Sequence, residues 1–156
     1  MSTTRESRCC SRIRITRGLG ALERGAAQTQ EPGPYLLQAS IAACHARAPS
    51  ADATDWKRIA ALYGELARVT PSPVVELNRA IAISRDEGPA AGLALLDALH
   101  EGGALERYPY LPAARADLLE RLGRREETAA EFDRAAALAE NTTQRGRLLA
   151  RARPLR

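Results

Sequence analysis

The chain has 156 residues, with 45% hydrophobic but only 4% aromatic side chains, which excludes a core built around large rings and favours close packing of alanine and leucine. Both residues favour helices, β-branched residues are sparse and no stretch alternates with period two, so we expect an all-α protein of one domain. The formal charge of +4 divides into +4 over residues 1–17, +5 over 141–156 and −5 over the body between them. An acidic body argues against a packed DNA-reading face, so only the two basic ends are left for DNA contact.

The N-terminal part carries the weakest helical signal of the chain. Residues 1–12 show no periodicity, and we expect them to form a disordered basic segment. Residues 13–30 have apolar side chains at helical spacing, but three glycines weaken this helix by about 1 kcal/mol each. Residues 31–34, Glu-Pro-Gly-Pro, are a firm break. We therefore expect a basic tail followed by one helical domain over 13–153.

A helix is predicted over about residues 34–47, starting at the proline that closes this break. Tyr35, Ile41 and Cys44 mark its apolar side, together with the neighbouring alanines. Cys44 is expected to act there as a small buried hydrophobe. The helix ends at the Ala-Pro-Ser run that follows it.

The next helix, which Thr70-Pro71 ends, has the clearest buried stripe of the chain. Asp52 or Thr54 is expected to cap it, with Asp55 placed favourably in its first turn. Five apolar residues then recur at intervals of three and four, which is helical spacing. They are Trp56, Ile59, Ala60, Tyr63 and Leu66.

Two further helices are predicted between residues 72 and 100, separated by a Gly-Pro turn at 88–89. Ser72 is expected to cap the first of them, with Pro73 in the first helical position. The inward-facing residues follow helical spacing and are Leu77, Ala80, Ile81 and Ser84 in the first helix, and Leu93, Leu96 and Leu99 in the second.

Residues 108–141 carry the most informative pattern, a helix–turn–helix unit with small residues at fixed steps. A small residue in the first helix is followed by a turn glycine, and then by a small, an aromatic and a small residue on one face of the second helix. These are Ala116, Gly123, Thr128, Phe132 and Ala135. The spacing is that of a tetratricopeptide (TPR) repeat, a unit of about 34 residues. The step from Ala80 to Gly92 equals that from Ala116 to Thr128 and predicts a second, weaker copy over about 73–100.

A unit of this kind predicts a stacked array, because it cannot bury its apolar face alone. Two antiparallel helices approach closely only where both present small side chains, and one bulky residue per unit fills the gap to the next. The last helix opens with a capping-box pattern of Asn141 and Gln144 and has few apolar residues, which is typical of the polar helix that ends a solenoid. We therefore expect a TPR-like array of helical hairpins, an α-solenoid of about eight to nine helices.

No residue pattern predicts catalysis. Cys9, Cys10 and the pair Cys44-His45 do not form the spaced ligand sets of a zinc site, and three cysteines are no disulfide framework. The serines lie at caps or on helices, outside any nucleophile elbow, and no glycine-rich loop follows a strand to hold phosphate. No apolar run approaches the roughly 20 residues of a membrane helix. We expect a cytoplasmic protein that is not an enzyme, with no metal, cofactor or membrane segment.

Partner binding is expected on the first helices of successive pairs, because these line the concave side of such an array. Polar residues there are candidate partner contacts; the alternative is that they are solvated positions of amphipathic helices. The candidates are Asn78 and Arg79 on one helix, and Arg115, Asp117, Glu120 and Arg121 on another.

Five segments carry a resemblance to a known family. They are GPYLLQASIAACHARAP (33–49), DWKRIAALY (55–63), SPVVELNRAIA (72–82), GPAAGLALLDAL (88–99) and AARADLLERLGR (113–124). Together they resemble the C-terminal extension of certain extracytoplasmic-function (ECF) sigma factors of bacterial RNA polymerase, in which a TPR-like helical domain follows the promoter- and polymerase-binding domains. The resemblance covers about 18–153 and implies a regulatory module of transcription initiation.

The family's promoter- and polymerase-binding domains lie upstream and have no counterpart here, and residues 1–17 match nothing in it. The resemblance therefore implies a truncated or mis-started sigma factor, or a detached extension, and no DNA-reading residue carries over. The implied partners are the family's own sigma domains, the RNA polymerase core or another regulator. A free-standing TPR-like scaffold for an unrelated protein or peptide is one alternative, and an enzyme with a pocket in the array is another.

Overall fold

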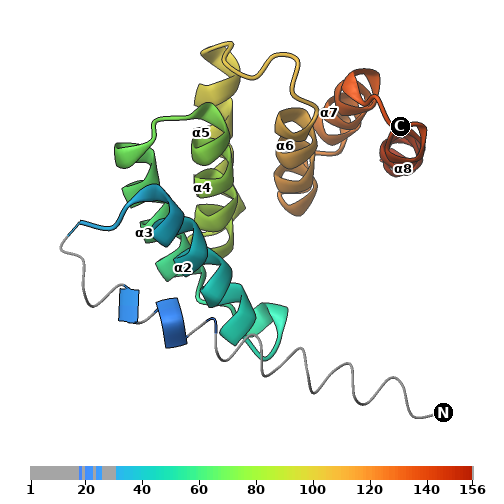
Figure 1. Cartoon of the computed structure of the whole chain (residues 1–156). Helices are drawn as coiled ribbons and strands as arrows, with labels where there is room; N and C mark the ends of the chain where they lie inside the picture. The colour runs from blue at the N-terminus through green and yellow to red at the C-terminus, as the bar shows by residue number, and fades with distance from the viewer. Residues whose placement is uncertain (1–17, 19, 23, 26–30, 156) are drawn as a thin grey trace. The chain divides into compact units, whose positions relative to one another are not determined.

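The protein is helical throughout the part that the structure describes. The computed structural model describes residues 18, 20–22, 24–25 and 31–155, and every regular element among them is a helix (Figure 1). The chain divides into two compact units, Met1–Thr70 and Pro71–Arg156. The tail expected over 1–12 and most of the helix expected over 13–30 lie outside the described residues, although those described between 18 and 25 are helical.

The first unit contains a packed helix pair. Helix α2 (Pro34–Arg47) packs against α3 (Trp56–Val69), and the short 3-10 helix η1 (Ala51–Ala53) lies in the connection between them. The ring of His45, near the end of α2, meets the ring of Trp56, at the start of α3, edge to face at 5.3 Å between centroids. The buried side chains of the two helices are Leu37, Ile41, Ala43, Ile59, Leu62 and Leu66.

Two details of this pair correct the sequence prediction. Tyr35 is 86% exposed, because it lies two positions, about half a turn, from the buried Leu37. The N-cap of α3 is Asp55, whose Oδ1 accepts a hydrogen bond from the backbone N–H of Arg58 at 2.9 Å. Asp52 therefore does not cap α3; it lies in η1, and Thr54 precedes the cap. Cys44 is half-buried.

The second unit is a run of five α-helices. They are α4 (Pro73–Asp86), α5 (Pro89–Glu101), α6 (Tyr110–Arg121), α7 (Arg125–Leu138) and α8 (Thr142–Ala152), followed by the 3-10 helix η2 (Arg153–Leu155). Helices α5, α6, α7 and α8 each pack against the helix before them, and α6 also lies against α4; Figure 1 shows α6, α7 and α8 following one another in this order. The unit thus consists of neighbouring helices packed in chain order.

Helices α4 and α5 cross closely because both present small side chains at the crossing. Ala80 is fully buried and Gly92 lies against it. A Cβ atom added at Gly92 would collide with the Cβ of Ser84 and would lie 2.7 Å from the carbonyl oxygen of Ala80. The Ser84 hydroxyl donates to the carbonyl of Ile81 at 2.7 Å, so its polar atom is satisfied inside the pair. Ala80 and Gly92, which the sequence pairs as the small residues of the weaker repeat, therefore do lie at the contact between the two helices.

Helices α6 and α7 are joined by the turn that the sequence predicts at Gly123. This glycine has φ 75°, a left-handed conformation that a side chain disfavours. The backbone amide of Arg124 donates to the carbonyl of Leu119 at 3.0 Å, and the backbone amide of Gly123 donates to the carbonyl of Glu120 at 3.0 Å. These two bonds form a Schellman motif, which ends α6 and turns the chain into α7.

The predicted interior of this pair is confirmed. Ala116, Thr128, Phe132 and Ala135 are all fully buried, and Phe132 is the largest fully buried side chain of the described residues. The Thr128 hydroxyl donates back to the carbonyl of Arg124 at 2.7 Å. Ala116, Phe132 and Ala135 belong to one apolar cluster that extends to Leu148 and Ala152 of α8.

Helix α8 starts at the N-cap residue that the sequence predicts, Asn141. The side chain of Asn141 accepts hydrogen bonds from the amides of Thr143 at 2.9 Å and Gln144 at 3.2 Å. Two otherwise unpaired amides of the first turn are thereby satisfied. Only Leu148 and Ala152 of this helix are buried, so α8 covers the end of the apolar cluster with one narrow stripe.

Candidate partner-binding groove

Two adjoining pockets lie between α4 and α6. One has a volume of about 280 Å³ and reaches from α4 to Arg151 of α8; the other has about 270 Å³ and reaches to the start of α6. They share three lining residues, Ile81, Ala114 and Asp117, and we call the two together the α4–α6 groove. Each pocket taken alone is slightly below the roughly 300–1,000 Å³ that is typical of small-molecule sites.

The floor of the groove is apolar because of small and aliphatic residues at helical spacing. Leu77, Ile81 and Ser84 lie three and four positions apart on α4, and therefore on one face. Opposite them on α6 lie Ala114 and, one turn further, Leu118. Ala114 is too short to fill the space between the helices, so the pocket remains open there.

The end of the groove nearest α8 holds a charged cluster. Arg151 of α8 places Nη1 2.6 Å from Asp117 Oδ1 and Nη2 2.5 Å from Glu120 Oε2. Its guanidinium carbon lies 4.2 Å from the centroid of the Phe132 ring, which is cation–π distance. Partial burial acts to lower the pKa of Arg151, but the hydrogen bonds to Glu120 and Asp117 outweigh it and raise that pKa.

The opposite end of the groove is aromatic. Tyr108 and Tyr110 pack against each other with ring centroids 5.1 Å apart and planes tilted by 55°. Tyr110 is 51% exposed, a large fraction for an aromatic ring in a chain with so few of them. The half-buried amide of Asn78 lines the same pocket. This end therefore offers ring faces and one amide to a partner.

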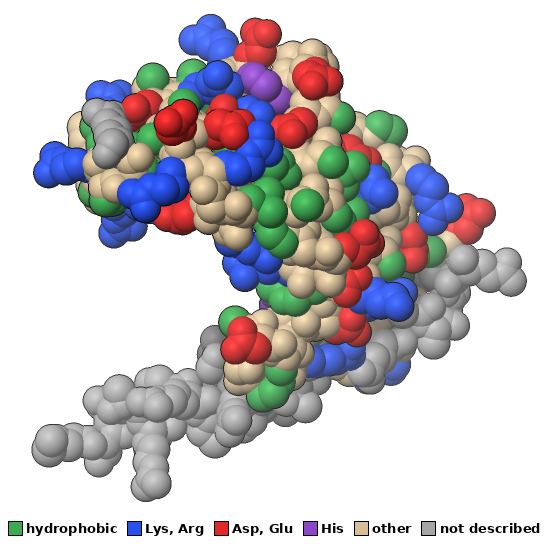
Figure 2. Space-filling view, turned by 180° about the vertical axis from the view of Figure 1, so that it is seen from behind, with side chains coloured by type: hydrophobic (Ala, Val, Ile, Leu, Met, Phe, Trp, Pro, Cys, Tyr) green, Lys and Arg blue, Asp and Glu red, His purple; other side chains and the backbone are tan. Residues whose placement is uncertain are grey.

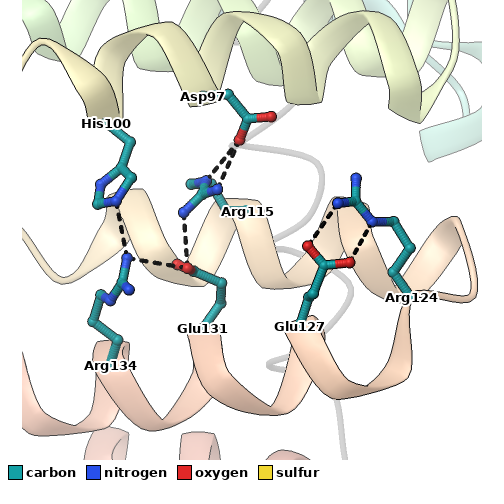
Figure 3. Close-up of polar contacts among 7 residues, drawn as sticks. All are labelled: Asp97, His100, Arg115, Arg124, Glu127, Glu131 and Arg134. Carbon is teal, nitrogen blue, oxygen red and sulfur yellow. Dashed lines mark hydrogen bonds and ion pairs between the residues drawn. The ribbon is translucent and has the colours of Figure 1, made fainter.

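A second polar cluster joins α5, α6 and α7 and is centred on Arg115 (Figure 3). Its guanidinium donates to Asp97 Oδ1 from Nη2 at 2.8 Å and from Nε at 3.0 Å, and to Glu131 Oε1 from Nη1 at 2.8 Å. The Glu131 side chain is only 8% exposed, and its Oε2 has no hydrogen-bond partner within the described residues. Because an unpaired buried carboxylate is costly, the ion pair with Arg115 stabilises Glu131 in the folded chain.

Arg134 and His100 extend this cluster toward the surface. Arg134 Nη1 lies 3.1 Å from Glu131 Oε1 and 3.1 Å from His100 Nε2 (Figure 3). Nearby, Arg124 and Glu127 form an exposed pair with two hydrogen bonds of 2.6 Å at the start of α7. The hydrogen bonds from Arg124 lower the pKa of Glu127.

Four of the six partner-contact candidates line the α4–α6 groove. Asn78, Asp117, Glu120 and Arg121 do so, and Arg121 Nη2 also donates to the carbonyl of Ser84 at 3.2 Å. The other two line neither pocket. Arg79 pairs with Glu76 of its own helix at 3.0 Å, and Arg115 is engaged with Asp97 and Glu131 as described above.

Sequence reasoning missed Arg151, Tyr108 and Tyr110 as groove residues. Arg151 is 34 positions from Asp117 on a helix that reads as a polar end cap, so no local spacing links them. The two tyrosines belong to the YPYLP run just before and at the start of α6, and two aromatic residues beside a helix start, in a chain with few aromatic residues, were a usable signal.

The described residues meet the requirements of neither a metal site nor a membrane-spanning helix. Among them no group of three or more histidine, cysteine or acidic side chains could hold a metal ion. No helix in the described part has the length and apolar character needed to span a membrane. On the face shown in Figure 2, basic and acidic side chains are interspersed with apolar ones.

Comparison with known proteins gives one informative similarity. The chain is 47% identical over 139 residues to an uncharacterized protein of Rhizobium meliloti (strain 1021). That match covers 89% of this chain but only 32% of the Rhizobium protein, so the chain spans about a third of that relative's length. No known protein family matches the chain, and no solved structure matches it.

Proposed function

We propose that this chain is a non-catalytic helical module that binds another protein through the α4–α6 groove. The observation that carries the proposal is the groove itself, with an apolar floor, two exposed carboxylates at one end and a pair of tyrosines at the other, of which Tyr110 is exposed. Interface cores are enriched in such aromatic and arginine side chains. Both carboxylates are engaged by Arg151, which favours recognition over proton transfer.

Helices α4 to α8 are proposed to form a TPR-like array. Support comes from the buried small residues at matching steps, from α4 lying against α6, and from the thin apolar stripe of α8. In such an array the first helix of each pair lines the concave side, and α4 and α6 are the helices that line the groove.

The proposed role of the module is regulation of transcription initiation in the bacterial cytoplasm, as the C-terminal part of an ECF sigma factor. The five sequence segments given above support it. The match to one third of a longer Rhizobium protein is compatible with it, because the remaining two thirds leave room for promoter- and polymerase-binding domains. The proposed partner is therefore a sigma domain or the polymerase core.

The test is a direct binding measurement. This chain is immobilised for biolayer interferometry and exposed to the Rhizobium relative without its matching third, to purified bacterial core polymerase and to serum albumin. We expect saturable binding to one of the first two and none to albumin.

Two charge-reversal variants test whether the partner binds in the α4–α6 groove. Asp117→Arg is expected to weaken binding about tenfold or more, since it puts a cation where the groove has an anion. Glu140→Arg makes the same charge change on an exposed residue outside the groove and is expected to have little effect. Absence of binding to both partners would refute the sigma-factor role, and an equal loss in the two variants would refute the groove as its site.

A further inference from the structure

The carboxylate end of the α4–α6 groove already binds a guanidinium group. Asp117 and Glu120 lie one turn apart on α6 and take the two terminal nitrogens of Arg151 at 2.6 and 2.5 Å. The guanidinium lies over the Phe132 ring, 4.2 Å from its centroid. Two carboxylates and a ring face are the groups that recognise arginine, whose planar fork fits them better than lysine does.

This internal arginine is held loosely enough to be replaced. The side chain of Arg151 is 46% exposed, and those of Asp117 and Glu120 are 52% and 45% exposed. Ion pairs with this much access to water contribute little to stability, because solvent and salt screen them. Arg151 also comes from α8, whereas both carboxylates are on α6, so its departure leaves the carboxylates in place.

Asp117 connects this cation site to the apolar part of the groove. It lines both pockets, and the second pocket continues from it over Leu77, Ile81 and Ala114 to the tyrosine pair. Asp117 is the only acidic residue lining that second pocket. A segment with an arginine at Asp117 and Glu120 would therefore place its neighbouring side chain against an apolar surface.

We propose that the α4–α6 groove recognises a partner segment in which an arginine stands beside a bulky apolar side chain, and that this arginine takes the place of Arg151 on Asp117 and Glu120. The inference rests on the proposed function, because it takes the groove to be the binding surface, and it adds the chemistry of the partner. In the free chain Arg151 occupies the site itself and competes with the partner.

Selection from random peptides tests the chemistry without knowledge of the natural partner. A phage-displayed library of random short peptides is panned on the folded wild-type chain, and enriched peptides are resynthesised with a fluorescent label for anisotropy titrations. We expect the enriched set to contain arginine adjacent to leucine, isoleucine, phenylalanine or tryptophan. Replacing that arginine by lysine in a peptide is expected to weaken binding several-fold, because lysine cannot form the paired contacts.

Three variants place these peptides on the carboxylates. Asp117→Asn with Glu120→Gln keeps the shape, removes both charges and is expected to weaken binding about tenfold. Arg151→Met keeps an apolar stem over Phe132, removes the competitor and is expected to strengthen binding about three- to tenfold. Glu140→Gln is the matched control and is expected to change nothing. Far-UV circular dichroism melts confirm that each variant folds.

Each contrary result overturns the inference. It is wrong if the library yields acidic peptides, if it yields no arginine-containing peptides, or if Arg151→Met weakens their binding. The outcome is separable from the sigma-factor test. If arginine peptides bind through Asp117 and Glu120 but the chain binds neither sigma domains nor polymerase, this inference stands and the sigma-factor role is refuted. If the chain binds sigma domains or polymerase but selects no arginine peptides, the sigma-factor role stands and this inference is refuted.

Discussion

The close crossing of α4 and α5 makes Gly92 the residue whose substitution tests the packing most directly. In an open helix, replacing glycine by alanine stabilises by about 1 kcal/mol. At Gly92 the new methyl group would lie 2.7 Å from the Ala80 carbonyl oxygen and 3.0 Å from Ser84 Cα, against the 3.4 Å at which ordinary contact starts. Both atoms belong to the backbone and cannot rotate away, and Ser84 Cβ would be closer still, so α4 and α5 must separate by more than about 0.7 Å.

The steric effect is expected to exceed the gain in helix propensity. Overpacking of a tight interior contact destabilises by about 1–3 kcal/mol, and the backbone clash here favours the upper half of that range. A separation of this size also weakens dispersion contacts along the rest of the helix pair, where Leu77, Leu93 and Leu96 meet. The net expectation for Gly92→Ala is a loss of about 1–2 kcal/mol in the free energy of unfolding.

Gly146 provides the matched control. It lies in α8 of the same unit, and a Cβ atom there would meet nothing within 4 Å. Gly146→Ala is therefore expected to stabilise by about 0.5–1 kcal/mol. Urea denaturation followed by circular dichroism at equal protein concentration measures both. If Gly92→Ala is as stable as the wild type while Gly146→Ala gains stability, the helices do not cross as closely as described.

Three further substitutions or modifications have expected outcomes. Phe132→Ala is expected to lower the free energy of unfolding by about 3–5 kcal/mol because Phe132 is fully buried, and a loss below about 1 kcal/mol in urea would contradict that packing. Arg115→Ala is expected to cost about 2–3 kcal/mol, since Glu131 keeps only Arg134 as a partner; an effect below about 0.5 kcal/mol would mean that Glu131 is not held by charge. Burial, followed by the negative charge of Asp55, raises the pKa of the Cys44 thiol, so iodoacetamide should modify Cys44 more slowly in the folded chain than in urea, as peptide mass spectrometry can measure. Because the pKa of Cys44 is raised in the folded chain, the neutral thiol stabilises the folded state at lower pH, and this contribution is lost as pH rises through the folded pKa. Equal alkylation rates of Cys44 in the folded and unfolded chains would refute the raised pKa and this pH dependence with it.

The helices of the second unit could be predicted from the sequence because their ends are marked by special residues. Pro73 and Pro89 stand in the first helical position of α4 and α5, and Gly123 adopts the positive φ that its turn requires. The first unit was harder to predict. The sequence predicts Tyr35 and Ile41 on the buried side of α2; Ile41 is buried there, but Leu37 is buried in place of Tyr35, which is exposed.

The groove could be predicted only in part, because its parts come from different kinds of signal. Asn78, Asp117, Glu120 and Arg121 follow from the position of α4 and α6 in the helix order. Arg151 does not, since the contact that brings it to Asp117 depends on how α8 packs across α7. Periodicity tells which face of a helix is buried, but it does not tell which distant side chain reaches that face.

The helix crossings of the second unit have no adjustable parts. Ala80, Ala116 and Ala135 are fully buried where the helices meet, and alanine has no side-chain torsion with alternative rotamers. The leucines around these points can absorb a small misfit by turning to another rotamer, but the alanines cannot. A change that enlarges one of these alanines can therefore be accommodated only when the backbone of its helix shifts. Such a shift moves the helix as a whole, and the helix packed on its other side has to follow.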